Sequence, residues 1–169
     1  GGAISLVVGT GDTGPGGSAT INAGDTTMDE ATGGSVCITG GLSTNAGTGG
    51  AVGAWGGTST SGTGGTIDLR SGEGLAASSG MVVIISANAG STGTSGRLVF
   101  SSGTSIAGNS GALLLGSGTA SAGSGGTITI AVGSGTSGEG GHLVMISGRS
   151  TTATGGPVLI TSGEGTQTS

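Results

Sequence analysis

The chain has no lysine and no tyrosine, and its 169 residues include one histidine, one cysteine, one tryptophan and one phenylalanine. Three arginines are its only cations, so it lacks the clustered positive charge and the stacking aromatics on which nucleic-acid binding depends. Its longest apolar run, 81–85, is far too short for a membrane-spanning helix. We therefore expect no nucleic-acid partner and no membrane span.

The residues for catalysis are also scarce. Because Cys37 is alone, no disulfide can form within the chain, and acid–base chemistry through an imidazole would have to use His142. Neither a GxSxG motif nor a P-loop lysine is present. We interpret His142 as an exposed substitution, because related segments place Thr127, Arg97 or Pro157 at its position. The sequence therefore predicts a protein that is not an enzyme and that holds no cofactor.

Two weaker binding signals occur near the N-terminus. Gly9–Gly14 matches the GxGxxG pattern of dinucleotide sites, but Pro15 follows where a helix should begin. Asp12, Asp25, Asp29 and Glu30 offer oxygens of the kind that Ca²⁺ prefers. The chain loosely resembles the glycine-rich nonapeptide arrays that bind Ca²⁺ in parallel β-rolls, but it lacks their aspartate in each repeat. We therefore predict no metal site and interpret the carboxylates as a solvated acidic loop.

What the chain has in abundance is glycine, 45 residues of it, arranged in a short repeat. Eleven copies follow one another, most of them fifteen residues long, and the second, third and sixth have one or two extra residues in turn-like stretches such as 26–32 and 91–94. A fixed short period is typical of a solenoid. The copies begin at Gly1, Gly16, Gly33, Gly49, Gly64, Ser79, Ser95, Ser110, Gly125, Gly140 and Gly155.

Positions within a copy, counted from its first residue and called places below, show an alternating pattern. Places four and six are mostly aliphatic, as in Ile128 and Ile130, and place nine is glycine in every copy except one, where it is Ala87. Alternation with period two indicates a strand, and glycine at a fixed place indicates a turn. We predict an all-β fold, a parallel β-solenoid of eleven coils with a flattened two-sided cross-section, that spans 1–169 as one array. The side chains of places four and six are expected to point inward as aliphatic ladders. A weaker second sheet is expected at places ten to thirteen, where the small residues at place eleven would let it lie close to the first sheet.

Places five and seven are expected to face outward, and both include large apolar residues. One interpretation is that these residues only raise strand propensity; the one we favour is a lateral association surface, because contiguous exposed apolar stripes mark interfaces. The predicted lateral residues are Val83, Val99, Leu114, Val144, Leu159, Trp55, Ile85 and Ile146.

Places ten and twelve are rich in threonine. Ordered threonines on fifteen-residue coils resemble the insect β-helix antifreeze proteins, in which a flat Thr-x-Thr array binds ice; here only Thr58-Ser59-Thr60 keeps that motif at these places. The resemblance implies ice binding as an alternative function, and if the chain is secreted the same hydroxyls offer sites for O-linked glycans. The residues predicted to face ice or glycans are Thr27, Thr44, Thr58, Thr60, Thr136, Thr151 and Thr166.

The ends of the array carry no polar or bulky caps, and the last copy is as regular as the inner ones. We therefore expect either a segment of a longer repeat protein or rods that stack head to tail. In composition the chain resembles the Gly/Ser/Thr-rich β-solenoid repeat proteins of microbial or algal fibres and surface layers. That resemblance implies a structural, self-assembling protein of an extracellular fibre or cell surface, with copies of itself as partners through head-to-tail and lateral packing.

Overall fold

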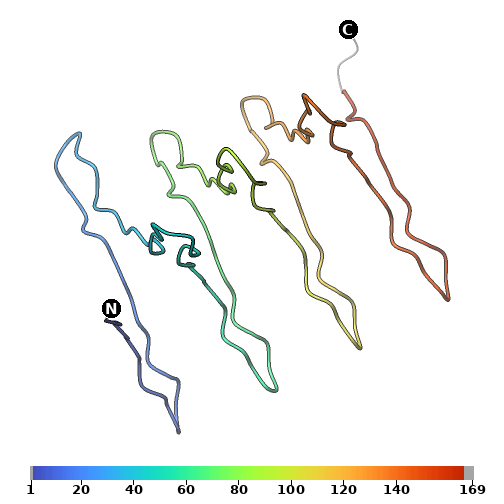
Figure 1. Cartoon of the computed structure of the whole chain (residues 1–169). Helices are drawn as coiled ribbons and strands as arrows, with labels where there is room; N and C mark the ends of the chain where they lie inside the picture. Colours follow the sequence, from blue (N-terminus) through green and yellow to red (C-terminus); the bar gives the residue numbers. More distant parts are fainter. Residues whose placement is uncertain (1, 166–169) are drawn as a thin grey trace. The chain divides into compact units, whose positions relative to one another are not determined.

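The computed structural model describes residues 2–165, and over that range the chain forms no helix and no β-strand. The predicted all-β fold, a parallel β-solenoid or β-helix of eleven coils, is therefore wrong, and so are its strand at places three to eight and its second sheet at places ten to thirteen. Instead the backbone runs out to a tip and back in successive loops, which Figure 1 draws without helices or arrows.

The loops follow the sequence repeat closely. Each tip is a bend of three residues near the end of a copy, at places 12–14, or at 13–15 in the three longer copies. The extra residues of the second copy lie within its loop, between the apolar segment and the next Gly-Gly pair. The bends span 12–14, 28–30, 45–47, 60–62, 75–77, 91–93, 106–108, 121–123, 136–138 and 151–153.

A single backbone hydrogen bond closes the base of most loops, and we call this base the neck. In each closed neck the amide of the glycine at place two of one copy donates to the carbonyl of the glycine at place nine of the preceding copy. The Gly65 amide, for example, lies 2.8 Å from the Gly57 carbonyl oxygen. The seven closed necks join Gly17 to Gly9, Gly34 to Gly24, Gly50 to Gly41, Gly65 to Gly57, Gly80 to Gly72, Gly141 to Gly133 and Gly156 to Gly148.

No strand forms because the hydrogen bonding stops at the neck. Besides the neck bonds, the backbone of residues 2–165 makes one further bond to itself, the turn from the Ala31 amide to the Met28 carbonyl. A folded domain carries about one hydrogen bond per residue, most of them between backbone groups. The alternating pattern was predicted to be a strand, but a strand needs a paired neighbour as well as two sides, and extended segments of a lone chain pair only marginally in water.

The chain also lacks a hydrophobic core over the described residues. None of them is buried, so the aliphatic side chains of places four and six, predicted to form inward ladders, are exposed. The only residues of 2–165 that are partly covered are small, and they sit at places eight and eleven: Ala23, Ser43, Gly74, Ser147 and Ser150. These residues line the inside of a neck or a bend, so their partial burial comes from the loop itself.

The chain divides into two compact units. The N-terminal unit, Gly1–Ile84, contains the first five bends, and the C-terminal unit, Ile85–Ser169, contains the other five. All five necks of the N-terminal unit are closed by a backbone bond, whereas in the C-terminal unit only the last two are.

Candidate functional site

Side chains at places five and seven lie on the same side of each apolar segment. Three pairs of such residues show this. The Arg70 guanidinium forms an ion pair with the Asp68 carboxylate, with Nε donating to Oδ1 at 2.8 Å. Cys37 Sγ lies 3.9 Å from the Thr39 hydroxyl, and the Trp55 ring occupies the position that a Cβ at Gly53 would take. Alternate residues of an extended backbone share a side, so places five and seven form one face and places four and six the other.

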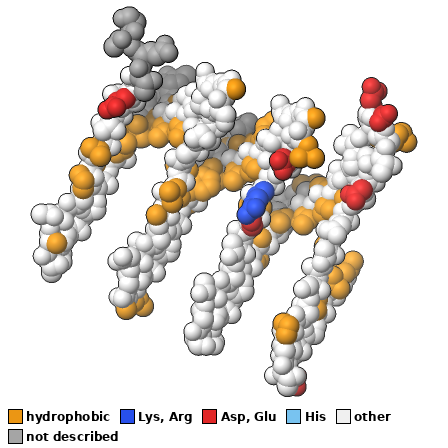
Figure 2. Space-filling view, turned by 180° about the vertical axis from the view of Figure 1, so that it is seen from behind, with side chains coloured by type: hydrophobic (Ala, Val, Ile, Leu, Met, Phe, Trp, Pro, Cys, Tyr) orange, Lys and Arg blue, Asp and Glu red, His pale blue; other side chains and the backbone are white. Residues whose placement is uncertain are grey.

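The residues predicted for lateral association are all strongly exposed. Trp55 is 86% exposed although its ring lies against Gly53. The place-five residues Val83, Val99, Leu114, Val144 and Leu159 are exposed, as are Ile85 and Ile146 at place seven. Figure 2 shows hydrophobic side chains open on the face that it presents. The opposite face is apolar too, because the large side chains of place four are all half exposed or more.

Serine at place eleven organises one kind of bend. The hydroxyl oxygen of Ser59 accepts a bond from the Gly62 amide at 2.8 Å, and Ser105 accepts from Gly108 at 3.1 Å. Ser150 does the same for Ala153 at 2.9 Å. In each case the acceptor lies three residues before the donor, so the side chain replaces a backbone carbonyl in closing the bend.

Glycine at place eleven gives a second, tighter kind of bend. A Cβ at Gly74 would lie 2.5 Å from the Ser78 carbonyl oxygen, and one at Gly135 would lie 2.9 Å from the carbonyl oxygens of Gly138 and Glu139. Gly11 is closed in the same way by the carbonyls of Gly14 and Pro15. At these six bends the residue is small because the bend either uses a short hydroxyl side chain or has no space for one, whereas Ala89 and Ala120 at the same place do neither. The predicted reason, close packing of two sheets, is wrong.

The threonines predicted to face ice or glycans lie on separate bends. Thr60, Thr136 and Thr151 begin their bends, Thr27 and Thr44 directly precede theirs, and Thr58 lies two residues before its own. All six are exposed, and Thr166 lies outside the described residues. A flat ice-binding array depends on a sheet to space its threonines, and residues 2–165 contain no sheet.

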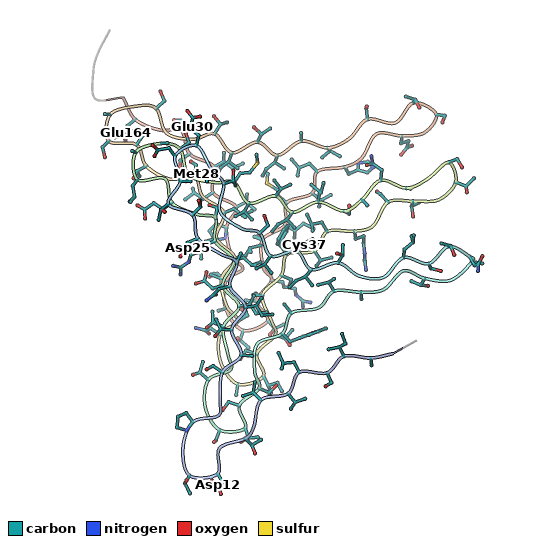
Figure 3. All side chains as sticks on the ribbon, turned by 90° about the vertical axis from the view of Figure 1, so that its left-hand side faces the viewer. Asp12, Asp25, Met28, Glu30, Cys37 and Glu164 are labelled. Carbon is teal, nitrogen blue, oxygen red and sulfur yellow. The ribbon has the colours of Figure 1, made fainter. Side chains whose placement is uncertain are left out.

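The candidates for metal or nucleotide chemistry remain apart. Figure 3 shows Asp12 at the tip of one bend, away from Asp25 and Glu30 on the next loop. Within residues 2–165 no three metal-ligating side chains come together, and there is no pocket. His142 is exposed, and the bend at 12–14 leads into further extended chain rather than a helix. No helix in the described part is able to cross a membrane.

The glycine at place nine was predicted to form a turn, but it accepts the neck bond instead, and the bend begins three or four residues later. The glycine at place two was given no role. Place two is glycine in all eleven copies, and in the closed necks it faces place nine. A Cβ at Gly50 would lie 2.7 Å from the Gly41 amide nitrogen, and one at Gly65 would lie 2.8 Å from that of Gly57. The signal was present in the sequence, because place two is more regular than place nine.

No protein-family model, curated protein or solved structure matches this chain.

Proposed function

We propose that this protein is a structural, self-associating component of an extracellular fibre or cell-surface layer, and that its exposed apolar segments pack laterally against other copies of the chain. The observation that carries the proposal is the exposure of the large hydrophobic side chains on both faces of the extended segments. Contiguous exposed apolar surface of this kind marks an association site.

The exposed area supports an intermolecular partner. The chain exposes 16572 Å², whereas a folded monomer of 15.2 kDa exposes about 7,100 Å² and an unfolded chain of that mass about 22,000 Å². A standard protein interface buries about 800 Å² on each partner. The surface left open by this chain is therefore enough for several such interfaces, which is the geometry that a fibre or layer needs.

The low charge of the chain and the position of its hydroxyl side chains favour the same function. Only 7% of the residues are charged, so few ions would have to be desolvated when copies pack. Head-to-tail stacking depended on the edges of a solenoid, so the proposal retains lateral association alone. Exposed hydroxyls at the bends, such as those of Thr136 and Thr151, lie away from the apolar segments and remain accessible to solvent or to O-linked glycans.

The proposal is tested by measuring how the average particle mass depends on the protein concentration. Sedimentation velocity and light scattering of the purified chain at physiological salt are expected to show a threshold concentration above which large assemblies form. A chain that stays monomeric at millimolar concentration would contradict the proposal. If that monomeric chain also depressed the freezing point below the melting point, and bulky substitutions at Thr58 and Thr60 removed the effect, ice binding would be the better interpretation.

A further inference from the structure

The two units differ in how much of each extended segment is apolar. In the N-terminal unit place five is polar or small in five of the six copies, as in Ser5, Thr20 and Asp68, and the exception is Val83 at the end of the unit. In the C-terminal unit place five is apolar in four of the five copies that begin within it: Val99, Leu114, Val144 and Leu159, with Thr129 the exception. Because neighbouring residues of an extended chain point to opposite sides, a run such as Leu113–Leu115 is apolar on both.

The two units also differ in charge. The N-terminal unit contains six acidic residues and one arginine, Arg70, which gives −6 + 1 = −5 and accounts for the whole net charge of the chain. The C-terminal unit contains Arg97, Arg149, Glu139 and Glu164, which gives +2 − 2 = 0 with His142 neutral. Two copies of the N-terminal unit repel each other, whereas two copies of the C-terminal unit do not.

Open necks provide a third difference. In the C-terminal unit no backbone hydrogen bond closes the three consecutive necks between Ala87 and Gly96, Gly103 and Gly111, and Gly118 and Gly126. Every neck of the N-terminal unit is closed. The open necks leave amides and carbonyls beside the segments that contain Leu98–Phe100 and Leu113–Leu115, where a partner that covers these segments is able to pair with them.

From these three differences we infer that the C-terminal unit is the half through which copies associate, and that its partner is the same unit of a second copy. The inference rests on the proposed function and narrows it from the whole chain to one half. Segments that are apolar on both faces need a partner on each side, so association through this unit continues beyond a pair. The acidic N-terminal unit remains toward water and keeps the assembly soluble at its surface.

The experiment compares two matched double variants of the full chain. The first variant, Val99→Thr with Leu114→Thr, introduces threonine at place five, where this unit already has a threonine in Thr129. The control, Ile38→Thr with Leu69→Thr, makes a comparable aliphatic-to-threonine change in the N-terminal unit, at place six, because place five there offers few aliphatic residues. The side chains have comparable exposure, 67% and 84% in the first pair and 71% and 75% in the control.

We expect the first variant to raise the threshold concentration for assembly by about tenfold or more, because each copy loses apolar surface at the interface. The control variant is expected to leave the threshold within about threefold of the wild type. Equal shifts in the two variants, or no shift in the first, would overturn the inference while leaving the proposed function intact. A wild-type chain that never assembles would instead refute the proposed function itself.

Trp55 provides a second readout, because it lies in the N-terminal unit and is the only tryptophan. Its emission is expected to keep the wavelength of a water-exposed indole while the wild-type chain assembles. A shift to shorter wavelength above the threshold would place the N-terminal unit in the interface and would contradict the assignment to the C-terminal half.

Discussion

At the scale of single residues, glycine has specific roles at particular places of the repeat: at place eleven it closes the tight bends, and at places two and nine it forms the neck. Place two and place nine meet across the neck, and their backbone atoms form the bond that closes a loop. The adjacent glycines at places one and two differ in this respect. A Cβ at Gly65 would lie 2.8 Å from the Gly57 amide nitrogen, whereas a Cβ at Gly64 would reach only ordinary contact, 3.5 Å from the Gly57 carbonyl oxygen.

This difference gives the first prediction. Gly65→Ala is expected to open the neck and lose a hydrogen bond worth about 1 kcal/mol, which lowers the hydrogen-exchange protection of the residue-65 amide roughly fivefold. Gly64→Ala is the matched control and is expected to leave that protection unchanged or slightly raised, because alanine reduces the freedom of the open chain. Equal protection in the two variants, measured by NMR, would show that the neck has space for a side chain at place two.

Glu30 is the one residue other than glycine in the described range with a positive φ, 59°. It lies in the turn that the Ala31 amide closes onto the Met28 carbonyl at 3.3 Å. The left-handed conformation costs a residue with a Cβ about 1–2 kcal/mol. Glycine fits such a position best, so this bend is strained where the other bends are not.

At the scale of the element, the loop is the recurring structure, and place eleven decides how its bend closes. Ser59, Ser105 and Ser150 accept a bond from the amide three residues later, whereas the Ser43 hydroxyl donates to the Asn45 carbonyl. A glycine there lets the backbone close directly. Both kinds occur in both units, as Ser59 and Gly74 show for the first and Ser105 and Gly135 for the second. The bends are therefore local structures that need no support from a core.

A second prediction follows for the serine bends. Ser105→Ala removes the acceptor of the Gly108 amide and is expected to destabilise that bend by about 0.5–1.5 kcal/mol. A protease of broad specificity is then expected to cut faster at 106–108, with the sites mapped by mass spectrometry. Ser101→Ala is the control, since the Ser101 hydroxyl donates to the neighbouring Ser102 carbonyl outside the bend, and faster cutting in that variant too would mean that the hydroxyl at place eleven does not hold the bend.

At the scale of the whole molecule, charge and apolar surface are distributed unequally along the chain. The net charge of −5 belongs to residues before 85, and the segments with two apolar faces lie mostly after it. Association through the second part brings the acidic parts of many copies into one assembly. Their mutual repulsion then opposes growth.

The salt dependence of assembly tests this balance. Raising the ionic strength from 0.01 to 0.15 M shortens the screening length from about 30 Å to about 8 Å, so the threshold concentration is expected to fall. Light scattering across a NaCl series measures the threshold. A threshold concentration that rises with salt would show that attraction between opposite charges drives assembly. It would contradict the view that apolar packing drives assembly and that charge repulsion opposes it.

The sequence allowed the repeat and the two sides of each apolar segment to be predicted, but it put the turn of each copy at place nine, whereas the bends lie at places 12–14 or 13–15. The i, i+2 pairs Asp68–Arg70 and Gly53–Trp55 show that the alternation describes real sidedness. It did not allow the strands to be predicted, because alternation at Ile128 and Ile130 specifies which way side chains point and not whether a neighbouring segment pairs with them. The separation of Asp12 from Asp25 likewise depends on which loop each residue occupies, and spacing along the chain does not contain that information.

The neck has one more consequence, for how this chain tolerates foreign sequence. Seven residues separate the bonded glycines Gly9 and Gly17, eight separate Gly41 and Gly50, and nine separate Gly24 and Gly34, yet all three necks carry the same bond. Closure therefore depends on the two backbones at the base and tolerates seven to nine residues between them. Each loop with a closed neck is therefore a display site, onto which a peptide epitope or a binding motif can be grafted at the tip while the repeat on either side keeps its register.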